Sequence, residues 1–289
     1  MPRSTRSALR RGLTLIELVV VMAIIAILAV MVIPRLDFLR TQAEHASSAG
    51  TQADLGSMIQ TFKASSGSYP SFDSLISSGG ALYTKLQQQT ALAAMDATTI
   101  PGASTGERWY ASFSDAGFKY VYTHSESASD ASGSATDAVD LVNQAASGSL
   151  KLATLKTTGG PSGLTAIRNA IYPGGATFVS GSNGPDTIAG TSDDVASTTT
   201  QLAAGTVPAG RMLVVFGVGP KSNLVSNVLA SAPSSAMGSD ESSTTYSRYF
   251  VIFEIYSNGD PAKFKMVTDH RLRQIGARVD LYKRGAQIQ

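Results

Sequence analysis

The sequence predicts an α+β fold, in which one long N-terminal helix packs on a head built around an antiparallel β-sheet. Three observations support this prediction: an uncharged apolar run from Leu18 to Ile33, apolar residues at helical spacing from Arg35 to about Ser65, and strand-like segments only after Gly67. A helical part followed by a run of strands is typical of α+β proteins.

The first element is the apolar run itself. Its sixteen residues from Leu18 to Ile33 carry no charge, and extending it back to Leu13 gives 21 residues. At about 1.5 Å per residue this is roughly 31 Å of helix, which is enough to cross a bilayer core. We therefore predict a single transmembrane segment at Leu13–Ile33. The extended run contains one acid, Glu17, and because a carboxylate beside the hydrocarbon costs roughly 2.5 to 3.5 kcal/mol, we expect it to have a functional partner.

The leader, residues 1–12, carries four arginines and no acid. The positive-inside rule predicts that it stays in the cytoplasm and that everything after Ile33 is exported. A secretory signal peptide would place small residues after the apolar run as its cleavage site, but Ile33, Pro34 and Arg35 follow instead. The plausible processing point is therefore Gly12, so that the apolar helix would remain on the mature protein.

The N-terminal segment resembles that of a known family. The string GLTLIEL at residues 12–18 is similar to the class III leader and N-terminus of type IV pilins and pseudopilins. The resemblance implies that a prepilin peptidase cuts between Gly12 and Leu13 and methylates the new N-terminus. It also places Glu17 fifth in the mature chain, where the family has its assembly glutamate, and Pro34 twenty-second, where the family has a helix-kinking proline. Leu13 stands where phenylalanine is usual.

The chemistry of Glu17 agrees with this resemblance. Once the leader is removed, Leu13 presents a positive amine, and Glu17 of a neighbouring subunit is a natural partner for it in a low-dielectric membrane. The alternative is a single-span anchor whose glutamate reaches the headgroups. Pro34 could simply end the helix, because proline lacks a backbone donor. Helical signals continue beyond Pro34, however, so a kink is favoured.

An amphipathic helix is predicted to continue from Arg35 to about Ser65. The apolar positions at approximately helical spacing are Leu36, Leu39, Ala43, Ala46, Leu55, Ile59 and Phe62. Residues 46–50 are weak helix formers, so a local melt there is possible. The helix should end near Gly67, with Pro70 following. This segment also resembles pseudopilins, in which a long helix ends in a Gly-x-Tyr-Pro turn.

Composition agrees with an exported, non-enzymatic subunit. Four of the 23 Lys and Arg residues belong to the leader, which leaves 19 against 21 acids, or a net charge of −2. No nucleic-acid partner is expected, because such binding needs a clustered basic face. Cysteine is absent, which excludes disulfides, a thiol nucleophile and cysteine metal sites. The missing disulfide loop also favours pseudopilins over type IVa pilins.

The head is predicted at residues 67–289, after a leader at 1–12 and an assembly helix at 13–66. Low-complexity loops or insertions are expected at Ser125 to Ser149, Ser180 to Thr206, and Ser231 to Thr245. Strands are expected at Phe118 to His124, Arg211 to Val218, Arg248 to Tyr256, Ala262 to Thr268, and Ala277 to Lys283. The turn at 257–260, Ser-Asn-Gly-Asp, joins the third and fourth of these into an antiparallel hairpin. Four or five strands would thus pack on the long helix.

One loop of the head has possible metal chemistry. Asp186, Asp193 and Asp194 converge if the six residues between them form a loop, and carboxylate and carbonyl oxygens at about 2.3 to 2.6 Å suit Ca²⁺. The segment resembles the calcium loop of the major, G-type pseudopilin of type II secretion, which implies these three ligands and the Asn183 carbonyl. Thr187 departs from a frequent glycine, and the motif lies about 95 residues from the C-terminus rather than near it. The alternative is a solvated Asp-rich turn.

Enzyme signatures are weak. His45, His124 and His270 fall on a predicted helix, a strand and a turn region, without the spacing of metal ligands. Residues 217–221, Gly-Val-Gly-Pro-Lys, lack the full phosphate-loop pattern and are expected to end a strand. Trp109 and its aromatic neighbours are expected in the core or in a subunit contact.

The sequence as a whole predicts a filament subunit in the bacterial inner membrane, with one membrane span and its N-terminus in the cytoplasm. The first choice is a structural subunit of a type II secretion pseudopilus. The resemblance implies that its partners are like subunits, other pseudopilins, a prepilin peptidase, and an assembly ATPase with its platform. The alternatives are a type IV pilus subunit, used in adhesion, motility or DNA uptake, and a membrane-anchored extracellular binding module.

Overall fold

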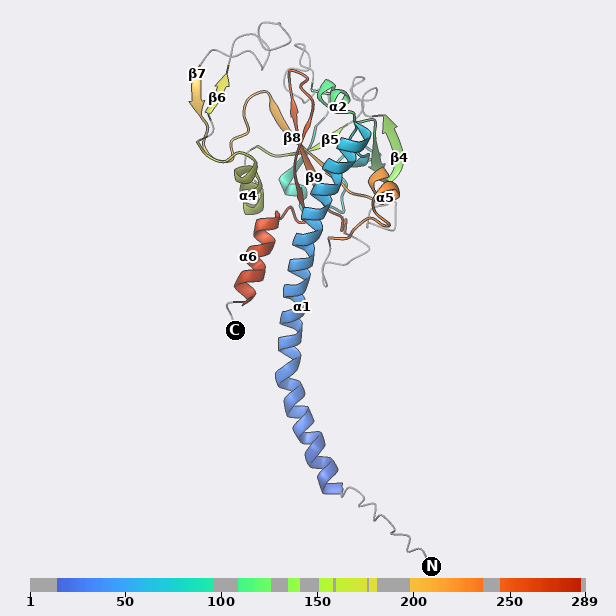
Figure 1. Ribbon diagram of the computed structural model, residues 1–289, viewed down its shortest axis with the longest axis vertical. Helices are drawn as coiled ribbons and strands as arrows, with labels where there is room; N and C mark the ends of the chain where they lie inside the picture. The colour runs from blue at the N-terminus through green and yellow to red at the C-terminus, as the bar shows by residue number, and fades with distance from the viewer. Residues whose placement is uncertain are drawn as a thin grey trace, which may run out of the picture.

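The structure, a computed structural model, describes residues 15–95, 109–125, 135–140, 151–157, 160–175, 177–180, 198–235 and 245–286. Figure 1 shows a long helical shaft, α1 (Leu15–Ser66), with a β-sheet head at its C-terminal end. The predicted α+β class, a long N-terminal helix and a mainly antiparallel sheet, is confirmed.

Helix α1 is continuous over 52 residues. It passes through Pro34 instead of ending there, and its ribbon is curved in Figure 1. The helix ends after Ser66, close to the predicted end, where Gly67 has a φ of 72°. A glycine adopts this left-handed conformation without a steric penalty and commonly closes a helix. Lys63 reinforces the last turn, because its Nζ donates to the Gly67 carbonyl oxygen at 2.8 Å.

No helix in the described part of the chain is long and apolar enough to cross a membrane. The transmembrane segment at Leu13–Ile33 therefore stays a prediction. The division of the chain into a leader at 1–12, an assembly helix at 13–66 and a head at 67–289 stays a prediction as well.

In the described residues the main sheet has eight strands, more than the four or five predicted. Their order is β10-β9-β8-β1-β3-β4, with β5 paired to β8 and β2 paired to β5. All pairs are antiparallel except β1 with β3. The strands are β1 (Phe72–Ser77), β2 (Leu92–Met95), β3 (Tyr120–His124), β4 (Ala135–Asp140), β5 (Leu152–Leu155), β8 (Arg211–Gly217), β9 (Phe250–Tyr256) and β10 (Lys263–Thr268). A separate hairpin pairs β6 (Thr177–Ser180) with β7 (Thr198–Gln201).

Shorter helices flank this sheet. They are η1 (Gln89–Ala91), α2 (Ala111–Ala116), α4 (Ser162–Ile171), α5 (Asn223–Asn227) and α6 (Ile275–Ala286). In Figure 1, α6 runs beside α1 below the head, and the C-terminus lies on the same side as the exposed shaft. The predicted hairpin at 257–260 is confirmed, because β9 and β10 pair directly across that turn.

The core has two layers, one on each face of the central strands. Successive residues of β8 and β9 point to opposite faces, as the two-residue period of a strand requires. The α1 face holds Leu55, Ile59, Phe62, Val214, Phe216, Val251, Phe253 and Ile255. The α4 face holds Leu164, Ile167, Leu213, Val215, Phe250 and Ile252. Because both faces are covered, these strands read in the sequence as near-continuous apolar runs.

Two predictions about the head are wrong in part. The strand expected at Ala277 to Lys283 is the middle of helix α6. The residue that α6 buries completely is Arg278, whose charge pairs with a buried acid, so apolar periodicity does not reveal the inward face. The low-complexity segments Ser125 to Ser149 and Ser180 to Thr206 were expected to be surface loops or insertions, and no strand was expected in them, yet they contain β4 and β7. Their backbone pairing does not require apolar side chains.

Candidate functional site

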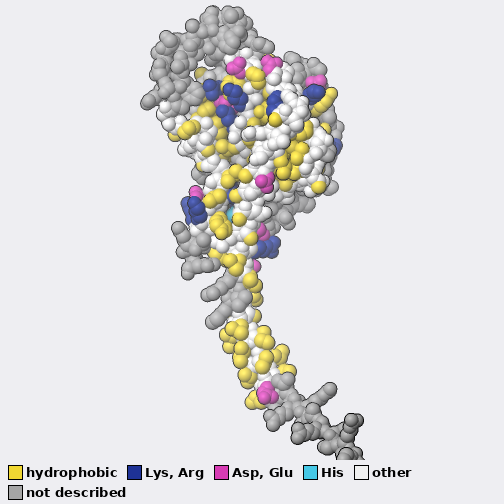
Figure 2. All heavy atoms as spheres, viewed as in Figure 1, with side chains coloured by type: hydrophobic (Ala, Val, Ile, Leu, Met, Phe, Trp, Pro, Cys, Tyr) yellow, Lys and Arg dark blue, Asp and Glu magenta, His cyan; other side chains and the backbone are white. Residues whose placement is uncertain are grey.

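The first functional feature is the uncovered N-terminal half of α1. Its large apolar side chains are between 49 and 83% exposed. They are Leu15, Ile16, Leu18, Val19, Val20, Val21, Met22, Ile24, Ile25, Ile27, Leu28, Val30, Ile33, Leu36 and Leu39. Figure 2 shows this apolar surface along the shaft, away from the head. An exposed apolar area of this extent is typical of a surface that binds protein or lipid.

The predicted assembly residues lie at the start of this surface. Glu17 is exposed in the first turn of α1. An acid at this position also interacts favourably with the positive end of the helix dipole. Gly12 and Leu13, the predicted cleavage site, lie outside the described residues. Pro34 lies within the continuous helix, between the exposed apolar turns and the part of α1 that carries the head.

The predicted calcium ligands are not described by the structure. Asn183, Asp186, Asp193 and Asp194 all fall in the segment 181–197, which lies between β6 and β7 and outside the described residues. In the part of the chain that the structure does describe, no group of three or more His, Cys, Asp or Glu side chains could hold a metal ion. Calcium therefore stays a prediction that rests on the sequence.

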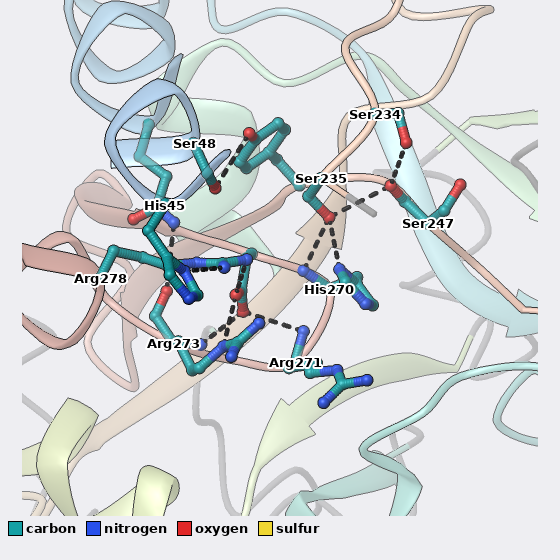
Figure 3. A network of polar contacts seen from close by, with 12 residues as sticks. His45, Ser48, Ser234, Ser235, Ser247, His270, Arg271, Arg273 and Arg278 are labelled. Carbon is teal, nitrogen blue, oxygen red and sulfur yellow. Dashed lines mark hydrogen bonds and ion pairs between the residues drawn. The ribbon is translucent and has the colours of Figure 1, made fainter. Parts of the chain in front are cut away.

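A polar network attaches the middle of α1 to the C-terminal part of the head (Figure 3). Its centre is the fully buried Asp269, just after β10. One carboxylate oxygen, Oδ1, accepts the backbone N–H groups of Arg271 and Arg273 at 2.9 and 2.7 Å. The other, Oδ2, pairs with Arg273 Nε at 2.7 Å and with Arg278 at 2.5 Å. The carboxylate thus fixes the turn that precedes α6 and the first turn of α6 together.

Helix α1 contributes four polar side chains to this attachment. The Nδ1 of His45 lies 2.9 Å from an Arg278 nitrogen, and Ser48 lies 3.3 Å from the Tyr249 hydroxyl. Gln52 donates to the Arg273 carbonyl at 3.4 Å, and Gln42 donates to the Tyr282 carbonyl at 3.3 Å. These contacts fall on one side of the helix, above its exposed apolar half, so they set the direction in which α1 leaves the head.

A second buried acid lies on β9. Glu254 is fully buried and accepts hydrogen bonds from the hydroxyls of Tyr172 and Tyr256. It also pairs with Lys265 at 2.5 Å and with Arg211 at 3.2 Å. Lys265 reaches it because this lysine is the extra residue of a β-bulge in β10, which redirects its side chain. Burial raises the pKa of Glu254, but the hydrogen bonds from Lys265 and the two tyrosines outweigh that effect and hold the pKa below its ordinary value.

A third buried acid, Asp73 on β1, has a different environment. The Tyr246 hydroxyl donates to its Oδ2 at 3.0 Å, and His124 Nε2 lies 3.6 Å from the same oxygen. Burial raises the pKa of the Asp73 carboxyl from 3.8 to about 8, although the hydrogen bond from Tyr246 lowers it. The carboxyl therefore keeps its proton at neutral pH. Leu75, two residues later, has a φ of 58°, so β1 is irregular beside this acid.

The Gly-Val-Gly sequence at the end of β8 makes room for this acid. A side chain at Gly219 would overlap the Asp73 carboxyl, and one at Gly217 would overlap the Tyr246 hydroxyl. The prediction that this motif ends a strand is confirmed, because β8 ends at Gly217. The paired glycines were one usable signal for the acid, but they did not indicate which side chain they accommodate.

The buried residues that sequence reasoning missed are therefore mostly ionisable. Asp73, Glu254, Asp269 and Arg278 are all fully buried, yet in the sequence they resemble ordinary surface residues. Trp109 lies in the core at 4% exposure, which is one of the two places expected for it. The contacts of these buried groups join strands of the sheet and attach α1 to the head.

The comparisons with known proteins concern the N-terminal end of the chain. A family model described as the prokaryotic N-terminal methylation motif matches residues 8–33. Neither the curated proteins nor the solved structures gave a match. The matched segment includes the predicted cleavage site at Gly12, the acid at Glu17 and most of the exposed apolar half of α1. The motif and the long helix that carries it support the similarity of this chain to type IV pilin-like proteins and pseudopilins.

Proposed function

We propose that this chain is a structural subunit of a type II secretion pseudopilus, which polymerises through the N-terminal half of α1. The observation that carries the proposal is the row of exposed apolar side chains from Leu15 to Leu39 on a helix whose other end is anchored in a folded head. A monomer in water would leave this surface hydrated at a high free-energy cost. A membrane before assembly and neighbouring helices after assembly would both remove it from water.

The proposed path begins at the inner membrane. A prepilin peptidase removes residues 1–12 and methylates Leu13, and the apolar helix holds the subunit as a single span with its N-terminus in the cytoplasm. The assembly ATPase and its platform then move the subunit into a filament of like subunits and other pseudopilins. Glu17 pairs with the new amine of a neighbour, since opposite charges interact strongly where water is excluded.

The choice of a pseudopilus over a type IV pilus rests on two sequence features. The chain has no cysteine, so it lacks the disulfide loop of type IVa pilins. Its Asp-rich loop at 183–194 resembles the calcium loop of the G-type pseudopilin. No enzymatic role is proposed, because the three buried acids described above are held in structural contacts. A type IV pilus subunit and an anchored binding module are the alternatives that the following experiment addresses.

The test is to replace Glu17 by alanine in the full chain expressed with its assembly machinery. The variant should be cleaved and membrane-inserted like the wild type but absent from sheared filaments. Asp37→Ala is the matched control, because Asp37 is also an exposed acid on α1 and should not affect assembly. Unchanged assembly of the Glu17 variant would contradict the proposal. Secretion measured in parallel separates a pseudopilus, whose loss blocks export, from a pilus.

We also propose that the loop holding Asn183, Asp186, Asp193 and Asp194 binds a structural Ca²⁺. Its support is the carboxylate spacing and the resemblance to the calcium loop of the G-type pseudopilin. A bound ion stabilises only the folded state, so calcium should raise the melting temperature of the full chain in detergent relative to a chelator. Asp193→Ala should remove that difference, whereas Asp54→Ala, at an exposed acid on α1, should keep it. Equal melting temperatures of the wild type with calcium and with chelator would leave a plain acidic turn.

A further inference from the structure

Helix α6 is held against α1 by polar contacts. It runs beside α1 below the head (Figure 1), and its fully buried Arg278 contacts both His45 on α1 and Asp269 before α6. In both apolar core clusters of the described residues, no member comes from Ile275–Ala286. The attachment of α6 to α1 therefore depends on hydrogen bonds and ion pairs.

The contact between His45 and Arg278 constrains the protonation state of the histidine. A guanidinium has only N–H donors, so the His45 Nδ1 must accept the hydrogen bond that the 2.9 Å distance indicates. Only a neutral imidazole with its proton on Nε2 can do this. When Nδ1 gains a proton, the hydrogen bond is lost, and two cationic groups then face each other at contact distance. We propose that His45 and Arg278 form an acid-sensitive latch, which holds α6 against α1 at neutral pH and releases it when His45 is protonated.

The charged groups around His45 favour the neutral form. Burial lowers its pKa, and so do Arg278 on α6 and Arg273 in the turn before it, while Glu44 on α1 and Asp269 raise it by less. The two acids have other partners. Glu44 pairs with Arg40 at 2.9 Å, and Asp269 is shared by Arg273 and Arg278. Neither acid is therefore free to neutralise a protonated His45 without giving up an existing pair.

The direction of the pH effect follows from this lowered pKa. With α6 separated from α1, His45 would bind a proton near its ordinary pKa of 6.5, whereas in the latched state it binds one only at lower pH. The open state thus binds more protons in this window, so the latch weakens as pH falls below about 6.5. His45 is only half-buried, so protons from the solvent can reach it while the latch is closed. Release would uncover α1 around Gln42 and His45, next to its exposed apolar half.

Spin-label distances in the full chain can test the latch. The chain has no native cysteine, so labels at Ala46→Cys on α1 and Asp280→Cys on α6 are unique, and both positions are exposed. In detergent at about pH 7.5 the pair should give one narrow, short distance, and at about pH 5 a longer and broader one. A control pair within α1, Ala46→Cys with Ala53→Cys, should be unchanged.

His45→Gln supplies the decisive comparison. Glutamine keeps a neutral acceptor but does not titrate in this range, so α6 should stay close to α1 at both pH values. An unchanged distance in the wild type would overturn the latch, and so would an equal shift in the His45→Gln variant. A shift in the control pair would overturn it as well, since α1 itself would then be unfolding. The latch does not depend on the proposed filament role, and either could fail alone.

Discussion

The two ends of α1 place similar side chains in opposite environments. In the N-terminal half, apolar residues such as Ile25 and Leu28 are more than half exposed, whereas Leu55 and Ile59 near the C-terminal end are buried against the sheet. Hydrophobicity alone does not distinguish them. What differs is the packing, because the head covers one end of the helix and leaves the other end exposed. The comparison teaches that one helix can serve both as part of a core and as an interface.

The two ends of α1 should also contribute to two different free energies, that of folding and that of subunit association. Burial in the head should determine whether the chain folds, and the exposed half should determine whether subunits associate. Substitutions at the two ends should therefore affect different measurements.

The largest expected effect separates folding from assembly. Phe253 is fully buried among aromatic rings of the core, so Phe253→Ala should lower the free energy of unfolding by about 3 to 5 kcal/mol. Leu28→Ala, in the exposed half, should change it by no more than about 0.5 kcal/mol but reduce assembly. Denaturant unfolding followed by the fluorescence of the single tryptophan, Trp109, gives both values. Comparable losses of stability would show that the two regions are not independent.

A second comparison uses glycines in the two environments. Gly219→Ala would place a methyl group against the Asp73 carboxyl, and such overpacking costs about 1 to 3 kcal/mol. Gly50 is exposed on α1, with open space where a side chain would be, so Gly50→Ala should stabilise the protein by about 0.5 to 1 kcal/mol. The melting temperature of each variant is measured on the full chain and compared with that of the wild type. A Gly219→Ala variant as stable as the wild type would mean that the residues around the Asp73 carboxyl are less tightly packed than the distances indicate.

The smallest expected effect is a pH dependence of the free energy of unfolding, which arises from a buried acid in the head. Burial raises the pKa of Asp73 from 3.8 to about 8, so the folded state holds a proton that the unfolded state releases. Its contribution to stability is complete below about pH 4 and is lost as pH rises towards 8. Asp73→Asn cannot titrate, so its stability relative to the wild type should increase over this range. A relative decrease would instead indicate an ionised Asp73 paired with a protonated His124.

The sequence predicted the shaft better than the head for a physical reason. The features of α1 are local: an apolar run, helical spacing, and Gly67 at the end. The central strands β8 and β9 were also predicted, because burial on both faces makes them continuously apolar. Helix α6 was assigned as a strand because its buried residue, Arg278, depends on Asp269 for a partner. Such a long-range pair leaves no periodic signal in the sequence.

The same contrast applies to the site residues. Glu17 and Gly12 belong to a short local motif, so their roles could be predicted without a structure. Asp73 and Glu254 acquire their environments from elements distant in the chain, such as the loop with Tyr246 and the bulge at Lys265. Only the fold brings these partners together.

The most direct test of the filament assignment is the mass of the N-terminal peptide from subunits in sheared filaments. If the chain is a filament subunit, these subunits should begin at an N-methylated Leu13 and be recovered with the filament fraction. Subunits that still carry residues 1–12, or processed subunits that never enter that fraction, would contradict it.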